Sequence, residues 1–310
     1  MSNKEVMENY GKNFLSVIEE KVATASGFNW LSPVFFSKGN YAFKGKAYKG
    51  INQLFLTLIK AIKGYDSSCW ITYKKAEELS KQTGKNIHVR AGEHGYPVIF
   101  WKPLERLDAD KKPLLNAKGE PEMVFMLRYY KVFNTEQLDL DGYELNLPEL
   151  KRNTEDVEDM EDWDSVLLET YKGNKPTIFH DKEDSNFYRP ATDEVHLCAF
   201  DRFRSTVEYL STLAHELGHS TGAKDRLNRF KDDSFERVPY SREELVAEMT
   251  SCMVQANFGI TETINNSAEY LKNWMQFLKK EPDCLVTAYS KAEKAADWIL
   301  GRDDKETGTV

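Results

Sequence analysis

The 310-residue chain has the composition of a globular protein, with 41% hydrophobic, 12% aromatic and 30% charged residues. It contains no apolar run near the roughly 20 residues that span a membrane. Its first residues, MSNKEVMENYGKNF, lack the apolar core of a secretory signal. These features exclude a membrane protein, and we expect a cytoplasmic one with residues enough for one large domain or two ordinary ones.

The four cysteines are scattered along the chain and form no CxxC pair. They are Cys69, Cys198, Cys252 and Cys284. Their spacing matches no metal site, so we expect reduced thiols, as in cytosolic proteins.

Charge is divided unevenly along the chain, although the net charge is −8. Residues 1–103 carry 15 Lys or Arg and 8 Asp or Glu, whereas residues 141–310 carry 21 and 35. This division predicts two surfaces for two kinds of partner. Residues 153–164, NTEDVEDMEDWD, hold seven acidic side chains and no basic one, which predicts a solvated linker. The alternative is a mimic of nucleic acid that folds back on the basic half.

Helical apolar spacing occurs early in the first half. Residues 12–25 predict one helix, and residues 48–65 predict another that Gly64 would end. Residues 69–84 predict a strand edge that leads into a helix, with Gly84 as its end.

Strand patterns follow these helices. Residues 86–104 contain two β-rich runs around a Gly-bounded turn, which predicts a hairpin, and residues 121–134 supply a further strand. Helices followed by antiparallel strands predict an α+β domain.

The second half predicts two short strands and a series of helices. The expected strands are 176–181 and 193–200, and the expected helices are 163–173, 201–220, 241–259, 267–282 and 285–301. Ser241 and Glu244 have the spacing of a capping box, and Gly259 would end the helix that they begin.

Residues 211–222, STLAHELGHSTG, contain a metal-binding motif. Residues i and i+4 lie on the same face of a helix, so His215 and His219 can aim both imidazoles at one ion. Glu216 is rotated by about 100° from His215 and can act on a water beside the ion. Zinc peptidases use this H-E-x-x-H pattern. It predicts one Zn²⁺, with another divalent ion such as Mn²⁺ as the alternative, and Glu216 as the catalytic residue.

A catalytic zinc needs a third protein ligand. The 241–259 helix offers Glu243, Glu244 and Glu248. Its E-x-x-A-E segment resembles the E-x-x-A-D arrangement of gluzincin peptidases. That resemblance implies Glu244 as the ligand and Glu248 as the carboxylate that orients a ligand histidine. The reverse assignment stays open, and surface histidines beside an unrelated acidic helix are the alternative to a metal site.

Four other residues are weaker candidates near this motif. His180 and Tyr188 could face the cleft as oxyanion donors, and Asp225 is a further ligand candidate. His196 lies on a strand that could line a substrate groove, but we expect an ordinary strand residue there.

Residues 28–49, FNWLSPVFFSKGNYAFKGKAYK, interleave aromatic rings with lysines. Rings that stack on bases and cations that follow phosphates are the ingredients of a surface for single-stranded nucleic acid. The alternative is that the rings belong to the core and the lysines to a solvated loop. The candidate DNA-binding residues are Trp30, Lys38, Tyr41, Lys44, Lys46, Tyr48, Lys49, Trp70, Tyr73, Lys74 and Arg90.

Eight segments, in order along the chain, resemble the ArdC-type antirestriction proteins of conjugative plasmids. They are YKGIN (48–52), CWITYKKAEEL (69–79), VRAGEHGYPVIFW (89–101), LRYYKVFNTEQ (127–137), FYRPATDEVHL (187–197), YLSTLAHELGHSTG (209–222), DRLNR (225–229) and YSREELVAEM (240–249). The chain departs from the family pattern at Ser220 and Ala223, where tryptophan and histidine are common.

The resemblance implies an α+β protein of two domains. We expect a single-stranded-DNA-binding domain in 1–145, an acidic linker in 146–164 and a zincin-like, gluzincin-type metallopeptidase domain in 165–310. The implied function is antirestriction for a mobile element, in which single-stranded incoming DNA is bound and protected. The alternatives are a DNA-directed zinc metalloprotease that cleaves protein targets, a plain zinc peptidase with no DNA role, and a metal site that is only structural.

Overall fold

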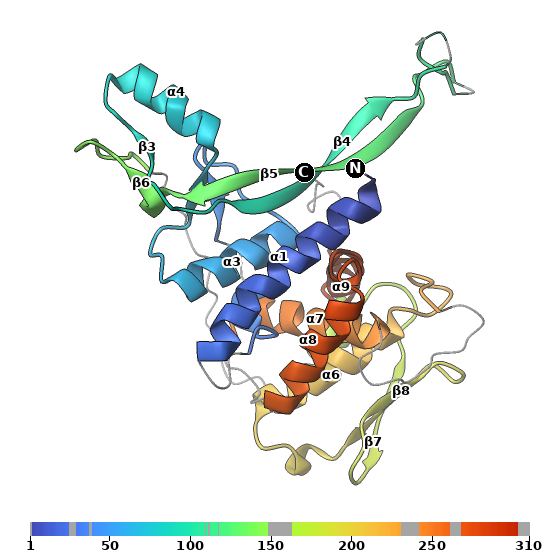
Figure 1. Ribbon diagram of the computed structural model, residues 1–310. Helices are drawn as coiled ribbons and strands as arrows, with labels where there is room; N and C mark the ends of the chain where they lie inside the picture. Colours follow the sequence, from blue (N-terminus) through green and yellow to red (C-terminus); the bar gives the residue numbers. More distant parts are fainter. Residues whose placement is uncertain are drawn as a thin grey trace.

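The computed structural model describes residues 2–24, 29–36, 39–108, 110, 112–116, 118–147, 163–230, 242–260 and 268–302 (Figure 1). The elements are, in chain order, α1 (Asn3–Thr24), α2 (Pro33–Phe36), β1 (Tyr41–Ala42), α3 (Ile51–Lys63), β2 (Cys69–Ile71), α4 (Tyr73–Thr83), β3 (His88–Val89), β4 (Tyr96–Glu105), β5 (Met123–Asn134), η1 (Thr135–Gln137), β6 (Leu138–Asp139), α5 (Trp163–Thr170), β7 (Thr177–Lys182), β8 (Phe187–Arg189), β9 (Glu194–Cys198), η2 (Phe200–Arg202), α6 (Thr206–Ser220), α7 (Arg242–Asn257), α8 (Ala268–Lys280) and α9 (Cys284–Ile299). This mixture confirms the α+β class.

Glycines end two helices of the first half where the sequence predicts. Gly64 follows α3 with φ 72°, and Gly84 follows α4 with φ 68°. A left-handed residue at this position is accessible to glycine at little cost, so it stops a helix cleanly. The predicted N-cap Ser241 lies outside the described residues.

The main sheet has the strand order β1-β2-β5-β4. Strands β4 and β5 form a long antiparallel hairpin that extends beyond the helices (Figure 1). The hairpin expected within residues 86–104 is therefore wrong. Strand β3 pairs with β6, through His88 and Asp139, while β4 pairs with β5. Strand β3 has only two residues and can form few hydrogen bonds with a neighbouring strand. In contrast, all ten residues of β4 pair with residues of β5.

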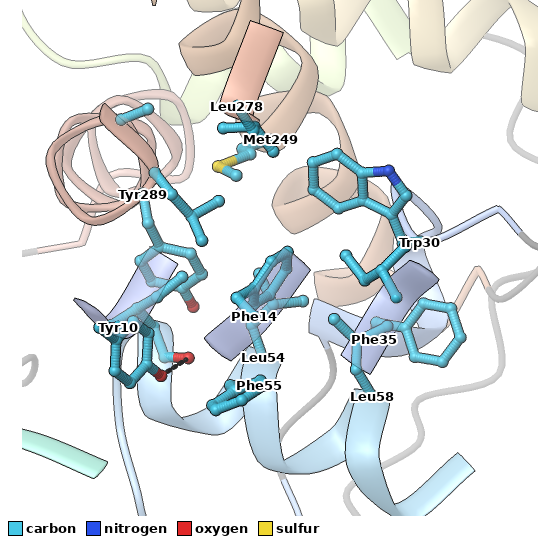
Figure 2. Close-up of a cluster of buried hydrophobic side chains, with 14 of the residues drawn as sticks. Tyr10, Phe14, Trp30, Phe35, Leu54, Phe55, Leu58, Met249, Leu278 and Tyr289 are labelled. Carbon is cyan, nitrogen blue, oxygen red and sulfur yellow. Dashed lines mark hydrogen bonds between the residues drawn. The ribbon is translucent and has the colours of Figure 1, made fainter. Parts of the chain in front are cut away.

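One hydrophobic cluster joins the helices of the two halves (Figure 2). Phe14 of α1 packs edge-on against Trp30, with ring centroids 5.6 Å apart, and Phe36 of α2 stacks on Tyr289 of α9 at 6.1 Å. Met249 of α7 is buried in the same cluster. The N-terminal and C-terminal parts of the chain therefore share a core. The limits 1–145, 146–164 and 165–310 stay a prediction, and most of the acidic segment lies outside the described residues.

A second cluster positions α6, the helix of the H-E-x-x-H motif. Leu210, Leu213 and Leu217 are fully buried on one side of α6, against the sheet β7-β9-β8 and helix α9. The pattern of buried leucines turns the histidine face of α6 away from this sheet, toward α7.

All four cysteines are buried free thiols, as expected. Burial raises the pKa of Cys69 and of Cys284 to about 12, so neither is a thiolate at neutral pH. Among the described helices, none combines the length and the apolar character needed to cross a membrane.

Candidate metal centre and nucleic-acid interface

Helices α6 and α7 bring two imidazoles and one carboxylate together. The Nε2 atoms of His215 and His219 lie 3.1 Å apart, and each lies 3.5 Å from a different oxygen of Glu244. One ligand atom from each residue falls within 4.8 Å of the other two. Two nitrogens and one oxygen converging in this way fit a single metal ion with an open coordination position.

The close approach of α6 and α7 depends on Gly218, inside the H-E-x-x-H motif. A Cβ atom at this position would lie 3.3 Å from the Thr250 side chain and 3.4 Å from the Ala247 Cα atom. Contacts this close are tighter than ordinary ones, so the Thr250 side chain or the two helices would have to shift by a few tenths of an ångström. The absence of a side chain at Gly218 therefore brings Glu244 within reach of both histidines.

Each histidine also has an outer carboxylate. The Nδ1 atom of His215 lies 4.0 Å from Glu248, and the Nδ1 atom of His219 lies 3.8 Å from Glu243. The structure places Glu244, and not Glu248, beside the two Nε2 atoms. Carboxylates behind the metal-facing nitrogens orient ligand histidines and make them better ligands.

Arg229 holds the carboxylate of Glu243 in place. Its guanidinium donates to Glu243 at 2.7 Å, to the Gly218 carbonyl at 2.8 Å and to the Thr221 hydroxyl at 2.7 Å. The arginine thus ties the start of α7 to the end of α6, next to His219. Arg229 belongs to the DRLNR segment, but its contact with Glu243 was not predicted from the sequence.

The site is electrostatically set for a cation. Burial lowers the pKa of His215, but its hydrogen bond with Glu244 and the charges of Glu248 and Glu216 raise it to about 9 overall. Burial raises the pKa of Glu244, but its contacts with the two imidazoles lower it well below the usual range. Without a metal the imidazole of His215 holds a proton at neutral pH, and a metal ion would replace that proton.

A cleft of 310 Å³ adjoins the metal ligands. Its walls come from α6, α7, the start of α2 with the residues before it, and the loop before β8: Leu31, Pro33, Asn186, Ser211, Thr212, His215, Glu216, Glu248, Ser251, Cys252 and Gln255. Glu216 is buried yet lines this cleft beside His215. A carboxylate in this place can exchange a proton with a molecule bound next to the metal ligands.

Arg226 fixes the loop that follows α6. Its buried guanidinium donates to the Asp193 carboxylate at 2.8 Å and to the Ser220 carbonyl at 2.7 Å. The Ser220 hydroxyl also hydrogen-bonds that of Tyr171 at 2.8 Å. Ser220 is fully buried, so no volume remains for the tryptophan that is common in the family at this position.

The four weaker candidates lie apart from the three metal-facing atoms. Tyr188 is fully buried and donates to Asp193, while His180 bonds the Tyr209 hydroxyl. His196 is buried between two phenylalanine rings, and Asp225 accepts from Asn174 at 2.9 Å. The oxyanion role expected for His180 and Tyr188 is not supported.

Three of the expected DNA-binding residues are core residues. Trp30 and Trp70 are fully buried, and Tyr41 is 6% exposed. A ring packed on both faces cannot stack on a base, so the expectation is wrong for these three. The indole N–H of Trp70 donates to Asn40 inside the core. Lys38 lies outside the described residues.

The remaining candidates are accessible to different degrees. Lys44, Lys46, Lys49, Tyr73, Lys74 and Arg90 are exposed, and Tyr48 is partly buried. Arg90 pairs with Glu93 at 3.0 Å, which balances its charge. The pKa of Glu78 is lowered by its hydrogen bond with Lys75 and also by the charges of Lys74 and Lys44, so these lysines gather at the start of α4.

Additional exposed rings, absent from the sequence prediction, extend this region along the β4–β5 hairpin. Tyr130 is 39% exposed, interacts with Tyr48, and packs edge-on against Phe100 at 5.6 Å. Phe100 is opposite Arg128 across the ladder. We name this set the aromatic–basic band. It comprises Lys44, Lys46, Tyr48, Tyr73, Lys74, Phe100, Arg128 and Tyr130.

Two family models match separate parts of the chain. Residues 10–133 match the N-terminal domain of anti-restriction factor ArdC, and residues 168–291 match a zincin-like metallopeptidase domain. Among solved structures, that of the antirestriction protein ArdC from plasmid R388 is similar in its metal-free form, with 31% identity and a TM-score of 0.64 over 94% of this chain and 96% of that one. Its Mn(II)-bound form is 30% identical over 97% of both chains, again with a TM-score of 0.64.

Similar proteins also include longer ones. The uncharacterized protein y4eC of Sinorhizobium fredii is 33% identical over 256 residues, which are 82% of this chain and 78% of that protein. A DNA primase TraC of Escherichia coli is 36% identical over 273 residues, which cover 84% of this chain. The match spans only 17% of that primase, and 24% of a second TraC primase that is 34% identical.

Proposed function

Because the chain belongs to the family of ArdC-type antirestriction proteins, we propose that it binds single-stranded DNA and protects incoming DNA from restriction. In addition, its zincin-like domain holds one divalent metal ion. The observation that carries the DNA-binding part is the aromatic–basic band on the half of the chain that matches the ArdC N-terminal domain.

The band has the two components of a single-strand surface. Its exposed rings, among them Tyr130 and Tyr73, offer faces on which bases of any identity can stack. Its lysines and Arg128 supply positive charge, and release of counterions would make binding salt-dependent. Binding without base-specific contacts suits a protein that must cover DNA of arbitrary sequence.

Tyr130→Ala tests the band, and Tyr129→Ala is its matched control. These neighbours have similar exposed fractions, 39% and 46%, but successive side chains of a strand point to opposite faces. We expect Tyr130→Ala to weaken binding of a labelled single-stranded oligonucleotide by about 5-fold or more, because one stacking contact contributes about 1–3 kcal/mol. Tyr129→Ala should bind like wild type. If fluorescence anisotropy gives equal affinities for the two variants, Tyr130 and its face of the hairpin do not bind the DNA.

His215, His219 and Glu244 would hold the metal ion, with Glu243 and Glu248 behind the two imidazoles. A bound divalent ion would supply a Lewis acid that polarises a carbonyl and acidifies water. Glu216, which lines the cleft, would accept a proton from a water there and return it to a leaving group.

His219→Ala tests the metal assignment. Loss of one of three ligands should reduce the metal content of the purified protein by about one ion per chain. Elemental analysis measures this after loading with Mn²⁺ or Zn²⁺. His88→Ala is the control, because His88 is exposed on β3 and belongs to another part of the molecule. Unchanged metal content in His219→Ala would refute the assignment.

A peptidase acting on protein targets is the second candidate function. The position of Glu216 in a cleft next to His215 favours it, because a purely structural metal site has no need of an open cleft or a base. Glu216→Gln should retain the metal and abolish any cleavage of protein substrates. Cleavage that persists in this variant would exclude the proposed role of Glu216.

A further inference from the structure

The cleft beside the metal ligands runs along α6 and α7 and has a distinct far end. On α7, Glu248 and Gln255 lie seven residues apart, about 10 Å along the helix axis. On α6, Ser211 lies one turn before His215. The cleft therefore extends away from the metal-facing atoms and ends at Gln255.

Gln255 carries an acceptor at this end that the described residues leave unused. The side chain is 2% exposed, and its Oε1 receives no hydrogen bond from any residue that the structure describes. Its Nε2 lies 3.2 Å from the Ser251 carbonyl oxygen and 3.2 Å from the Ser211 hydroxyl. Because a carbonyl can only accept, the amide nitrogen must face Ser251, and the oxygen is the atom that remains.

A buried acceptor without a donor costs free energy comparable to a lost hydrogen bond. The cleft also contains two carboxylates, Glu216 and Glu248, and its described lining includes no lysine or arginine. Leu31 and Pro33 add apolar surface from the N-terminal half. Apolar walls, negative charge and a terminal acceptor together complement a long side chain with a cationic donor at its tip.

We propose that this cleft is a recognition subsite for a lysine or arginine side chain of a protein substrate, with Gln255 accepting a hydrogen bond from the ammonium or guanidinium group. This inference rests on the proposed metal centre, since the substrate would be held beside it. Gln255 is thereby a specificity-determining residue and takes no part in proton transfer.

The test compares two ligands that differ only at the tip of the side chain. Nα-acetyl-lysine hydroxamate and Nα-acetyl-norleucine hydroxamate both carry a metal-binding group, and the norleucine compound has a hydrogen atom in place of the ammonium group. Binding to the Mn²⁺-loaded full chain is measured by titration calorimetry, with acetohydroxamate as the ligand without a side chain. We expect the lysine compound to bind at least about 10-fold more tightly than the norleucine compound, as for a charged donor that meets a buried acceptor.

Gln255→Leu should reduce this preference several-fold while acetohydroxamate binds as in wild type. Gln82→Leu, at an exposed position of α4, should leave the preference unchanged. Equal affinity of wild type for the two side-chain ligands would overturn the inference alone, because acetohydroxamate binding would still support the metal centre. Failure of all three hydroxamates to bind would overturn the metal centre and this inference together. The wild-type comparison decides the matter even if Gln255→Leu does not fold.

Discussion

Glu243 is a carboxylate whose charge is balanced inside the protein. Burial raises its pKa, but contacts with His219 and Arg229 lower it below the usual range, so it stays ionised. The Arg229 and Glu243 side chains are 5% and 18% exposed. Removing one partner of a buried pair leaves the other charge uncompensated, and this costs about 3–5 kcal/mol.

Arg229→Gln should therefore destabilise the protein by about 3–5 kcal/mol and weaken metal binding by about 10–100-fold, because Glu243 would no longer be held behind His219. Competition with a chelator measures the affinity, and urea unfolding measures the stability. Arg242→Gln is the control, because Arg242 and Glu281 form an equally short ion pair, 2.7 Å, with side chains 58% and 40% exposed. Its effect should stay below about 1 kcal/mol. Similar losses in both variants would contradict the role given to Arg229.

Sequence reasoning located residues whose contacts are local. His215 and His219 were predicted because an i, i+4 pair on a helix meets regardless of the rest of the fold. The role of Arg229 was not, because its partner Glu243 lies 14 residues further along the chain and on another helix. The role proposed for Gln255 was not predicted either. It depends on whether a neighbouring described residue donates a hydrogen bond to the Gln255 Oε1 atom, and this cannot be read from the sequence.

At the scale of elements, the packing of α6 on α7 sets the ligand geometry. Gly218 allows this packing, while the 3.3 Å that a Cβ would leave to Thr250 is tighter than an ordinary contact. A glycine inside a helix costs about 1 kcal/mol relative to alanine, so its presence here indicates a steric requirement.

Gly218→Ala should give a net loss of about 1 kcal/mol in stability, because overpacking costs about 1–3 kcal/mol and the gain in helix propensity offsets only part of it. Metal affinity should fall as α6 and α7 separate. Thr250→Ser removes the methyl group that the new Cβ meets, so it should partly restore both properties in the double variant. If Gly218→Ala is more stable than wild type and binds the metal equally well, then the space between α6 and α7 accommodates a Cβ atom at position 218, and the steric requirement is refuted. Thermal unfolding and chelator competition supply the data.

The ends of helices could be predicted from the sequence more reliably than the pairing of strands. The ends of α3 and α4 were predictable because glycine marks them chemically. The partner of β4 was not, because the connection to β5 is 17 residues long, 106–122, whereas a sequence pattern identifies a hairpin most readily when its loop has two to five residues.

At the scale of the whole molecule, the two family-matched regions share one hydrophobic cluster. Phe14 of α1, Trp30 in the segment before α2 and Phe55 of α3 are buried in the cluster that also contains Met249 and Tyr289 of the second half. Cutting the chain between the halves would expose this apolar surface to water. Experiments on DNA binding and metal binding therefore require the full chain with point substitutions.

Packing between distant parts of the chain explains why some aromatic residues were misassigned from the sequence. Trp30 is buried in the cluster that also contains residues of α7 and α9, more than 200 residues further along the chain, whereas Trp70 packs against Tyr65 and Tyr96 of the first half. Trp30 and Trp70 serve the core, while Tyr130 and Phe100, which lie on the projecting hairpin, remain accessible. Binding of single-stranded DNA stays a proposal, and the surface proposed for it is now the aromatic–basic band.

The most direct test of the account is protection of single-stranded DNA from a restriction endonuclease that cuts single strands, with full-length variants. Wild type and Tyr129→Ala should protect the DNA, and Tyr130→Ala should require a higher protein concentration, by about the factor it loses in DNA affinity. Full protection by Tyr130→Ala at wild-type concentration would contradict the account. Loss of protection in Glu216→Gln, with DNA binding intact, would contradict it as well and assign the function to the metal centre.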